Sequence, residues 1–373
     1  MTSLHTDFCD LMDIKYPIVQ AGMSTGVDEW MPSPPRLAAA VSNAGGLGVM
    51  GCGSRKLETI DWAIREIKKL TTQPFGVDLL LPATMAEVDV ETTGQVRDRL
   101  ARDYPSHVAF VEELRKEHNL AVVELTDAPA MTPDQLRKQF EVVLDHKVPV
   151  FVAGLGDPSW VVPLAREQGM RVGGMVGAVR HAVRQKAAGV DFVGAQGTEA
   201  GGHTGNIASF VLIPQVVDSI APIPVMAAGG VSSGRHVAAA LALGAQAAWV
   251  GTAFLVAEEN AIPREQQEQI LAGRSEQFTL STYGTGKQQR GHHNSVKDAW
   301  AQSGLPALPM PLQGVLMEPF ITAARQAERW DLVGNPAGQV GGMLTERRPA
   351  ADILTDMVRE TEETIERQRS NLR

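Results

Sequence analysis

Short apolar runs that end in glycine or other small residues recur along the first two thirds of the chain. Longer stretches with helical spacing lie between most of them, at residues 35–44, 57–70, 159–168, 176–188 and 233–243. A short apolar run bounded by turn residues is typical of a buried strand, and the longer periodic stretches predict helices. The runs predicted as strands are residues 17–21, 48–50, 75–80, 149–153, 171–175, 191–195, 224–228 and 247–250.

This alternation of strand and helix predicts the fold. Parallel strands need a crossover between them, so a repeating βα order indicates an α/β protein with a parallel sheet. Eight such units favour closure into a (β/α)8 TIM barrel, whose functional loops follow the carboxyl ends of the strands. An open, doubly wound sheet is the competing architecture.

The predicted barrel covers residues 1–255 and contains one long connection after its third strand. That connection has a charged, weakly periodic first part and two helical segments, 106–118 and 132–146, the second with Thr132 as N-cap. We interpret about residues 82–131 as an insertion and its first part as a candidate lid. Residues 256–373 are expected to form a partly helical C-terminal extension that packs on the barrel, with a glycine-bearing middle, TYGTGKQQRGHHN.

One imidazole stands in a loop that has few side chains. His203 follows an apolar strand and lies between Gly201 and Gly202 on one side and Gly205 on the other. Glycine lets the backbone approach a planar ring and adopt positive φ freely. The segment therefore indicates a cofactor face with a catalytic acid or base, and the plainer alternative is a glycine-rich turn that carries a histidine.

Two glycine turns follow neighbouring predicted strands. Gly229 and Gly230 come after strand 224–228, and Gly251 and Thr252 come after strand 247–250. Backbone N–H groups at adjacent strand ends form an anion site, and the last two loops of a barrel commonly hold a phosphate. The pattern predicts a phosphate site, with an ordinary βαβ unit as the plainer alternative.

Composition narrows the class of protein. A net charge of −9 and an isoelectric point near 5.5 argue against nucleic acid as a partner. Cys9 and Cys52 give no disulfide framework and suit a reducing cytosol. The amino terminus lacks the pattern of a signal peptide, so a cytoplasmic location is expected. Residues 238–257 are uncharged, but their alanine-rich composition favours a buried helix and strand over a membrane span.

Several familiar motifs fail on their context. Residues 46–51 match GxGxxG, but a predicted helix precedes them and a strand runs through them, the reverse of a dinucleotide-binding turn. Residues 284–287 lack the spacing and the Ser or Thr of a P-loop. No metal is expected at His292 and His293, which have no carboxylate or Cys at ligand spacing. Cys52 is a weak candidate nucleophile because small loop cysteines are usually inert.

Six ordered motifs together resemble the nitronate monooxygenase family, formerly called 2-nitropropane dioxygenases. The resemblance covers about residues 14–255 and implies an FMN-binding TIM barrel. The family also contains flavin-dependent enoyl-acyl-carrier-protein reductases and NADH:quinone reductases, so the resemblance implies FMN more firmly than one reaction. The motifs are PIVQAGMS (17–24), SNAGGLG (42–48), PFGVDL (74–79), AQGTEAGGHTG (195–205), AAGG (227–230) and GTAFL (251–255).

The resemblance also implies roles for single residues. His203 falls on the family's catalytic histidine. The implied cofactor-binding residues are Ala21, Gly22 and Met23 along the isoalloxazine, Gln196 and Gly201 at the flavin or its ribityl chain, Gly229, Gly230, Gly251 and Thr252 at the phosphate, and Gly202, Asp78 and Trp249 as further contacts.

Two positions depart from the family pattern. Asp78 stands where the family usually has Asn, and Trp249 stands where a Gln often precedes the phosphate turn. A carboxylate near the ring edge disfavours an anionic reduced flavin, to an extent that depends on its burial.

The expected reaction is oxidation of an alkyl nitronate, or of its parent nitroalkane, to a carbonyl compound and nitrite. Flavin takes electrons from the substrate and passes them to O2, while His203 acts as base or orients the nitro group. Two alternatives stay open: an NAD(P)H-dependent flavin reductase of quinones or enoyl thioesters, and a phosphate-ligand-binding barrel without catalysis. The expected partners are a small-molecule substrate and O2, without nucleic acid or membrane, and a homodimer is one option for the oligomeric state.

Overall fold

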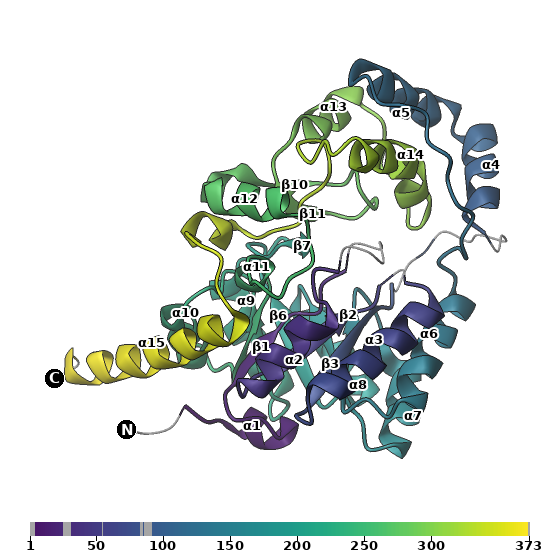
Figure 1. Cartoon of the computed structure of the whole chain (residues 1–373). Coiled ribbons are helices and arrows are strands. Elements are labelled where there is room, and N and C mark those ends of the chain that lie inside the picture. Colours follow the sequence, from purple (N-terminus) through teal and green to yellow (C-terminus); the bar gives the residue numbers. More distant parts are fainter. Residues whose placement is uncertain (1–3, 25–30, 54, 83–84, 86–91, 372–373) are drawn as a thin grey trace.

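The computed structural model describes residues 4–24, 31–53, 55–82, 85 and 92–371. Eight parallel strands close into a barrel in chain order, and β1 pairs with the last strand, β9 (Figure 1). Closure confirms the predicted (β/α)8 barrel and excludes the open sheet. Each strand lies within one residue of its predicted ends: β1 Ile18–Gln20, β2 Leu47–Gly51, β3 Phe75–Leu80, β4 Val150–Gly154, β5 Arg171–Val176, β6 Phe192–Gln196, β8 Val225–Ala228 and β9 Ala247–Val250.

Helices cover the outside of the barrel, and α2 packs closely on β2. A Cβ atom at Gly48 would lie 1.9 Å from the Ala38 carbonyl oxygen, so only glycine fits under this helix. The 3-10 helix η1 (Pro158–Trp160) precedes α7. The surrounding helices are α2 Pro35–Asn43, α3 Leu57–Leu70, α6 Pro133–Asp145, α7 Val161–Glu167, α8 Val179–Ala188, α9 Ser209–Ile220, α10 Gly234–Ala242 and the short α11 Thr252–Leu255.

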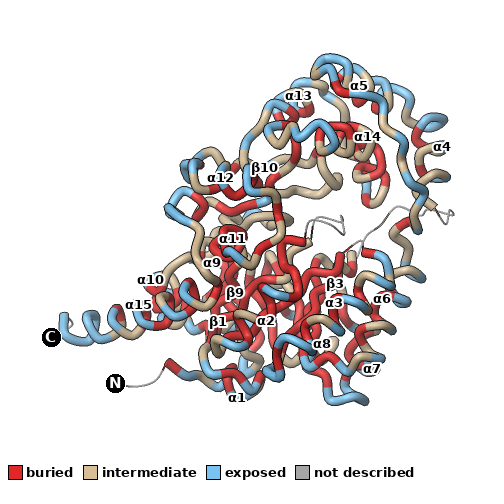
Figure 2. Tube along the Cα trace, in the orientation of Figure 1, coloured by how far each residue is buried: buried red, intermediate tan, exposed pale blue. Residues whose placement is uncertain are grey.

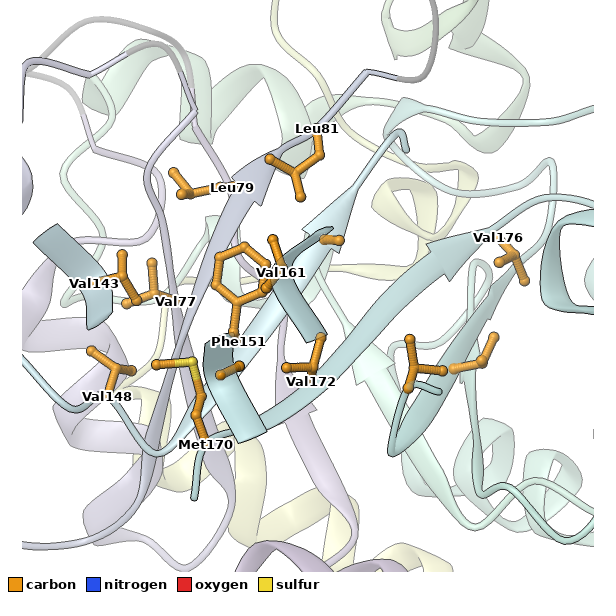
Figure 3. Packing of buried hydrophobic residues seen from close by; sticks show 14 of the residues in the cluster. Val77, Leu79, Leu81, Val143, Val148, Phe151, Val161, Met170, Val172 and Val176 are labelled. Carbon is orange, nitrogen blue, oxygen red and sulfur yellow. The ribbon is translucent and has the colours of Figure 1, made fainter. Parts of the chain in front are cut away.

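Successive side chains of each strand point to opposite faces, so the core has one layer inside the barrel and one between the strands and the helices. Val150 and Val152 of β4 belong to the cluster inside the barrel, while Phe151 and Ala153 belong to the cluster between strands and helices. Figure 3 shows the outer layer, where Phe151 lies among aliphatic side chains of the neighbouring strands and helices. The strands are therefore buried on both faces, as Figure 2 shows.

Helix α1 (Asp7–Met12) closes the amino-terminal end of the barrel. Phe8 is fully buried and meets Phe192 edge to face, with 5.8 Å between ring centroids. The opposite end of the barrel, at the carboxyl ends of the strands, is the end that carries the functional loops in this fold.

The insertion and the C-terminal extension share a second hydrophobic core. We call the four helices that form it, α4 (Thr93–Asp103), α5 (Pro105–Glu117), α13 (Ser295–Ser303) and α14 (Leu312–Gln326), the cap. Helices α4 and α5 pack against α13 and α14 above the barrel (Figure 1). Arg97 of α4 also pairs with Glu318 of α14 at 2.9 Å. Residues 83–84 and 86–91, in the part interpreted as a lid, lie outside the described residues.

Helix α4 was not predicted, because it lies in the segment that was interpreted as charged and weakly periodic. It begins with a capping box in which Thr92 accepts from the Gln95 backbone N–H and the Gln95 side chain accepts from Thr92. Its low apolar content hides it, because only Val96 and Leu100 are buried.

The rest of the extension joins the cap to the barrel. Strands β10 (Phe278–Ser281) and β11 (Gln289–His292) form a hairpin, and β11 pairs antiparallel with the two-residue strand β7 (Gly202–His203). The glycine-bearing middle of the extension is therefore a hairpin on the barrel mouth. The remaining elements are α12 (Arg264–Ala272), η2 (Ser275–Gln277), η3 (Gln339–Met343) and the long α15 (Ala350–Asn371), which packs along α10 and α2.

None of the helices in the described ranges has the length and apolar character needed to cross a membrane. The uncharged residues 238–257 fold as the end of α10, a turn, β9 and α11.

We expect Phe320→Ala to lower the free energy of unfolding by about 3–5 kcal/mol, because the ring is fully buried in the cap and its loss leaves a cavity. Urea unfolding followed by circular dichroism measures the change. Phe210→Ala is the control, since that ring is 75% exposed and should cost little. Equal losses for both variants would contradict a well-packed cap core.

Candidate active site

A cavity of about 660 Å³ opens at the carboxyl ends of the barrel strands, beneath the extension. Its walls come from nearly every strand-end loop and from the hairpin and the loop before η3. The predicted catalytic and cofactor-binding residues all line this one cavity, while their roles toward a cofactor stay predictions. They are Ala21, Gly22, Met23, Asp78, Gln196, Gly201, Gly202, His203, Gly229, Gly230, Trp249, Gly251 and Thr252.

Buried polar side chains fix the loop after β1. Gln20 donates to the Ser33 hydroxyl at 3.0 Å and to the Val49 carbonyl at 3.1 Å. Ser33 in turn donates to the Ala21 carbonyl and accepts from the Met23 backbone N–H, both at 2.9 Å. Because these groups are buried, the bonds hold Ala21 to Met23 in one conformation against the cavity.

Asp78 lies in the second half of β3 and is buried against Gly22. A Cβ atom on Gly22 would lie 2.4 Å from Asp78 Cβ, so glycine is required for this contact. Burial raises the pKa of Asp78 to about 8. At pH 7 the side chain is therefore mainly the neutral acid, and the repulsion of an anionic flavin expected from the sequence is weakened.

The turns after β8 and β9 present bare backbone to the cavity. Gly229 and Gly230 have φ of 88° and 76°, a region that other residues rarely adopt. In the described part of the chain, the N–H groups of Gly229, Gly230 and Gly251 donate to no protein acceptor. A Cβ on Gly251 would meet nothing closer than 3.6 Å, so its missing side chain leaves open space. This cradle has the character of an anion site.

A hydrogen-bond network supports the first of these turns. Glu199 accepts from the Ser209 backbone N–H and from its hydroxyl, at 3.0 and 2.9 Å. The Ser209 hydroxyl also lies 2.9 Å from the Gly229 carbonyl oxygen. The network links the loop that carries His203 to the turn at Gly229.

The extension lies directly on this loop. A Cβ on Gly201 would lie 2.6 Å from the Ala337 carbonyl carbon, so this glycine is required by the extension. Gly202 has φ of 69°, and nothing lies within 4 Å of where its Cβ would be. Thr252 also faces the extension, because its hydroxyl accepts from the Gly338 N–H at 2.9 Å.

His203 is held by residues of the hairpin. Its Nε2 lies 2.8 Å from Thr285 Oγ1 and 2.8 Å from Gln289 Nε2. Its carbonyl oxygen accepts a hydrogen bond from the Gln196 side chain. Burial, and then the Lys287 ammonium, lower the pKa of His203 to about 4. The imidazole is therefore neutral at pH 7, and it is a weaker base than its ordinary pKa indicates.

Sequence reasoning missed these partners of His203. Thr285 and Lys287 lie in the GTGK stretch that fails as a P-loop, and no short-range pattern joins them to a histidine 82 or more residues earlier. Arg290 fixes the hairpin by donating to the Thr198 and Phe278 carbonyl oxygens at 2.9 and 2.5 Å. The signal that could have found them was the cluster of glycine and polar residues in TYGTGKQQRGHHN.

A basic group on α8 was also missed. Arg180, His181 and Arg184 line the cavity on its β5 side. Within the described part of the chain, neither arginine has a carboxylate partner. Desolvation, and then the charges of Arg180 and Arg184, lower the pKa of His181. The protein is acidic overall, so this cationic wall is a local feature.

Three remaining candidates are placed as follows. Trp249 of β9 is buried in the barrel interior and forms part of the cavity wall. Cys52 is fully buried, and burial raises the pKa of its thiol, so it is not a nucleophile in this state. His293 lies 3.1 Å from Asp298, and the described residues contain no group of three or more metal-ligating side chains.

The chain is similar to known proteins in sequence and in fold. A family model described as nitronate monooxygenase matches residues 5–360. A protein from Mycobacterium tuberculosis that is named as a monooxygenase is 35% identical over 349 residues, which cover 88% of this chain and 92% of that protein. The structure of nitroalkane oxidase from Streptomyces ansochromogenes aligns with a TM-score of 0.80 at 29% identity, over 95% of this chain and 98% of that one. FabK from Thermotoga maritima aligns with a TM-score of 0.77 at 28% identity, over 99% of both chains.

We expect Asp78→Asn to gain stability relative to the wild type as the pH rises from about 4 to about 8. In this range the folded wild type keeps the proton that the unfolded chain has lost, so its stability falls with pH by up to about 1.4 kcal/mol per pH unit. Above the folded pKa both states are ionised and the difference levels off. Urea unfolding at a series of pH values measures it.

Asp218→Asn is the matched control for Asp78→Asn, because Asp218 is exposed on α9. Its stability should follow that of the wild type across the same pH range. A constant difference between Asp78→Asn and the wild type would show that Asp78 is ionised when folded.

Proposed function

Because the chain belongs to the nitronate monooxygenase family and is a flavin-dependent oxidoreductase, we propose that it binds FMN and oxidises alkyl nitronates with O2 to a carbonyl compound and nitrite. The observation that carries this proposal is one cavity that combines the Gly229, Gly230 and Gly251 cradle with a neutral histidine. A phosphate-ligand barrel without catalysis would need the cradle but has no use for His203.

The cradle fits the single phosphate of FMN. Three N–H groups at adjacent strand ends, which have no acceptor among the described residues, can donate to phosphate oxygens. The GxGxxG match at residues 46–51 coincides with strand β2, so it is not a turn that could hold a pyrophosphate. We infer FMN rather than FAD, and Ala21, Gly22 and Met23 would contact its ring.

When bound, FMN supplies the two-electron acceptor for the substrate and the route to O2. The protein must bind the substrate, orient it and manage its charge. A nitronate has already lost its α-proton, whereas a neutral nitroalkane needs a base. The lowered pKa of His203 makes the ring a poor base, so the site favours the preformed nitronate and uses His203 to orient the nitro oxygens.

A second candidate function is NAD(P)H-dependent reduction of quinones or enoyl thioesters. Two observations favour it: the similarity to FabK over the whole chain and the pair Arg180 and Arg184 in the cavity wall. Guanidinium groups bind phosphates well, so this wall could receive the phosphates of a nicotinamide dinucleotide. The same wall could instead attract an anionic nitronate.

We expect a nitronate added without oxygen to bleach the protein-bound flavin within the time of one turnover, and readmitted O2 to restore the colour. Stopped-flow absorbance in the flavin band measures both steps, and NADH is tested in parallel. Fast bleaching by NADH and none by nitronate would replace the monooxygenase proposal with the reductase.

We also expect the purified protein to release FMN, and not FAD, on heat denaturation.

We expect Gly230→Val to lose FMN affinity at least tenfold while staying folded. Valine at φ of 76° is strained, and its side chain would lie in the cradle. Fluorescence titration of the apoprotein with FMN measures the dissociation constant.

Gly304→Val is the matched control for Gly230→Val. Gly304 has φ of 67° and open space around it, but it ends α13 in the cap, away from the cavity. It should lose similar stability and keep its FMN affinity. Unchanged affinity in Gly230→Val would mean that the phosphate lies elsewhere.

A further inference from the structure

Three polar atoms form a closed triangle beside the cavity. His203 Nε2, Thr285 Oγ1 and Gln289 Nε2 lie 2.8 Å from one another along all three edges. Thr285 and Gln289 belong to the hairpin, and His203 belongs to the barrel loop, so the triangle joins the two parts of the chain.

The protons in this triangle can be assigned by elimination. An amide nitrogen only donates, and Gln289 Nε2 lies too close to His203 Nε2 for both nitrogens to carry a hydrogen between them. His203 Nε2 must then carry a lone pair. This single lone pair accepts one hydrogen bond, from the Gln289 amide or from the Thr285 hydroxyl, and either choice leaves the proton of the ring on Nδ1. A proton on Nε2 would instead face an amide donor, which costs an unsatisfied polar group.

We propose that Thr285 and Gln289 are positioning residues that fix His203 as the Nδ1–H tautomer, so that the ring meets its substrate as a hydrogen-bond donor. The proposal deepens the proposed function, because it rests on an anionic nitronate as the substrate that accepts this bond. In the described part of the chain, Nδ1 has no protein partner, and the ring lines the cavity. Nδ1–H is therefore the group left for a ligand.

Backbone pairing holds the triangle in place. Gln289 and His203 are direct partners in the β7–β11 register, which brings their side chains to the same part of the sheet. Arg290, the next residue, is tied to the Thr198 carbonyl oxygen on the barrel loop. The donor is thus oriented before substrate arrives, which is the condition under which a single hydrogen bond stabilises developing charge strongly.

The charged groups around the ring agree with a neutral donor. Lys287 lies two residues after Thr285 in the hairpin, and its ammonium charge disfavours protonation of His203. Arg180 and Arg184 add positive charge to the same cavity, while Asp78 is mainly neutral at pH 7 and Glu199 is occupied by Ser209. Nitronate oxygens would then meet an N–H donor inside a cationic surrounding, and no strong base.

The test is ¹⁵N NMR of the folded protein labelled at histidine, with His203→Asn used to assign the signal of His203. We expect the wild type at neutral pH to show a protonated Nδ1 and an unprotonated Nε2. A protonated Nε2 with a bare Nδ1 would overturn the proposal, because the Gln289 amide would then present its oxygen and His203 would be free to act as a base.

Gln289→Glu tests the cause. A carboxylate can only accept, so it should move the proton to Nε2, raise the pKa of His203 and, at alkaline pH, leave Nδ1 as a lone pair. Nitronate turnover by this variant should then fall about tenfold or more as the pH rises through the raised pKa, a step that the wild type lacks. An unchanged tautomer in Gln289→Glu would also overturn the proposal.

Gln288→Glu is the matched control. It adds the same charge one residue away, where the side chain contacts Asn206 and not His203, so the tautomer of His203 should not change. If Gln289→Glu does not fold, Gln289→Met removes the donor without adding charge and should give a mixture of tautomers. The NMR result is independent of substrate, so failure of nitronate oxidation alone would count against the proposed function and leave the tautomer assignment intact.

Discussion

The pairing of β7 with β11 is the contact on which the site depends. Only two residue pairs form it, yet it brings Gln289 opposite His203 and places Arg290 against the barrel loop. Gly201 allows the backbone near Ala337 to come within contact distance on the other side of the loop. Without the hairpin, His203 would be a histidine in a glycine-rich loop with no fixed ring orientation. The barrel supplies the glycine cradle, and the extension fixes the orientation of the His203 ring.

Burial gives the cavity a neutral lining where the sequence shows ionisable groups. Asp78 keeps its proton because it is desolvated, and His203 lacks one for the same reason. Both effects move the groups toward the uncharged form at pH 7. Besides Glu199, whose carboxylate accepts hydrogen bonds from Ser209, the charged groups in the cavity wall are the arginines of α8 and Lys287. An anionic substrate in this cavity therefore meets oriented N–H groups and more distant positive charges. This arrangement stabilises an anion without supplying a base.

Local patterns predicted the barrel well, because each strand is short, apolar and buried on both faces. His203 and the glycine turns, which the patterns selected, line one cavity with the residues that the family resemblance implied, since strand ends in a barrel converge on one face. Long-range contacts were not predictable in this way. Thr285 and Gln289 reach His203 through a strand pairing across more than 80 residues, and α4 has too few buried residues to show a period. The protonation of Asp78 depends on burial, which spacing cannot give.

The cap has a consequence for how the protein is made. Its core joins residues 93–117 of the insertion to residues 295–326 of the extension, so about half the chain separates the two halves. On the ribosome, α4 and α5 leave the exit tunnel long before their partners exist. Buried residues such as Val96 and Leu114 cannot be covered until residues 295–326 have been synthesised. The barrel strands are synthesised before the hairpin and the cap helices of the extension, so the fold that carries His203 can form before the contacts that orient its ring.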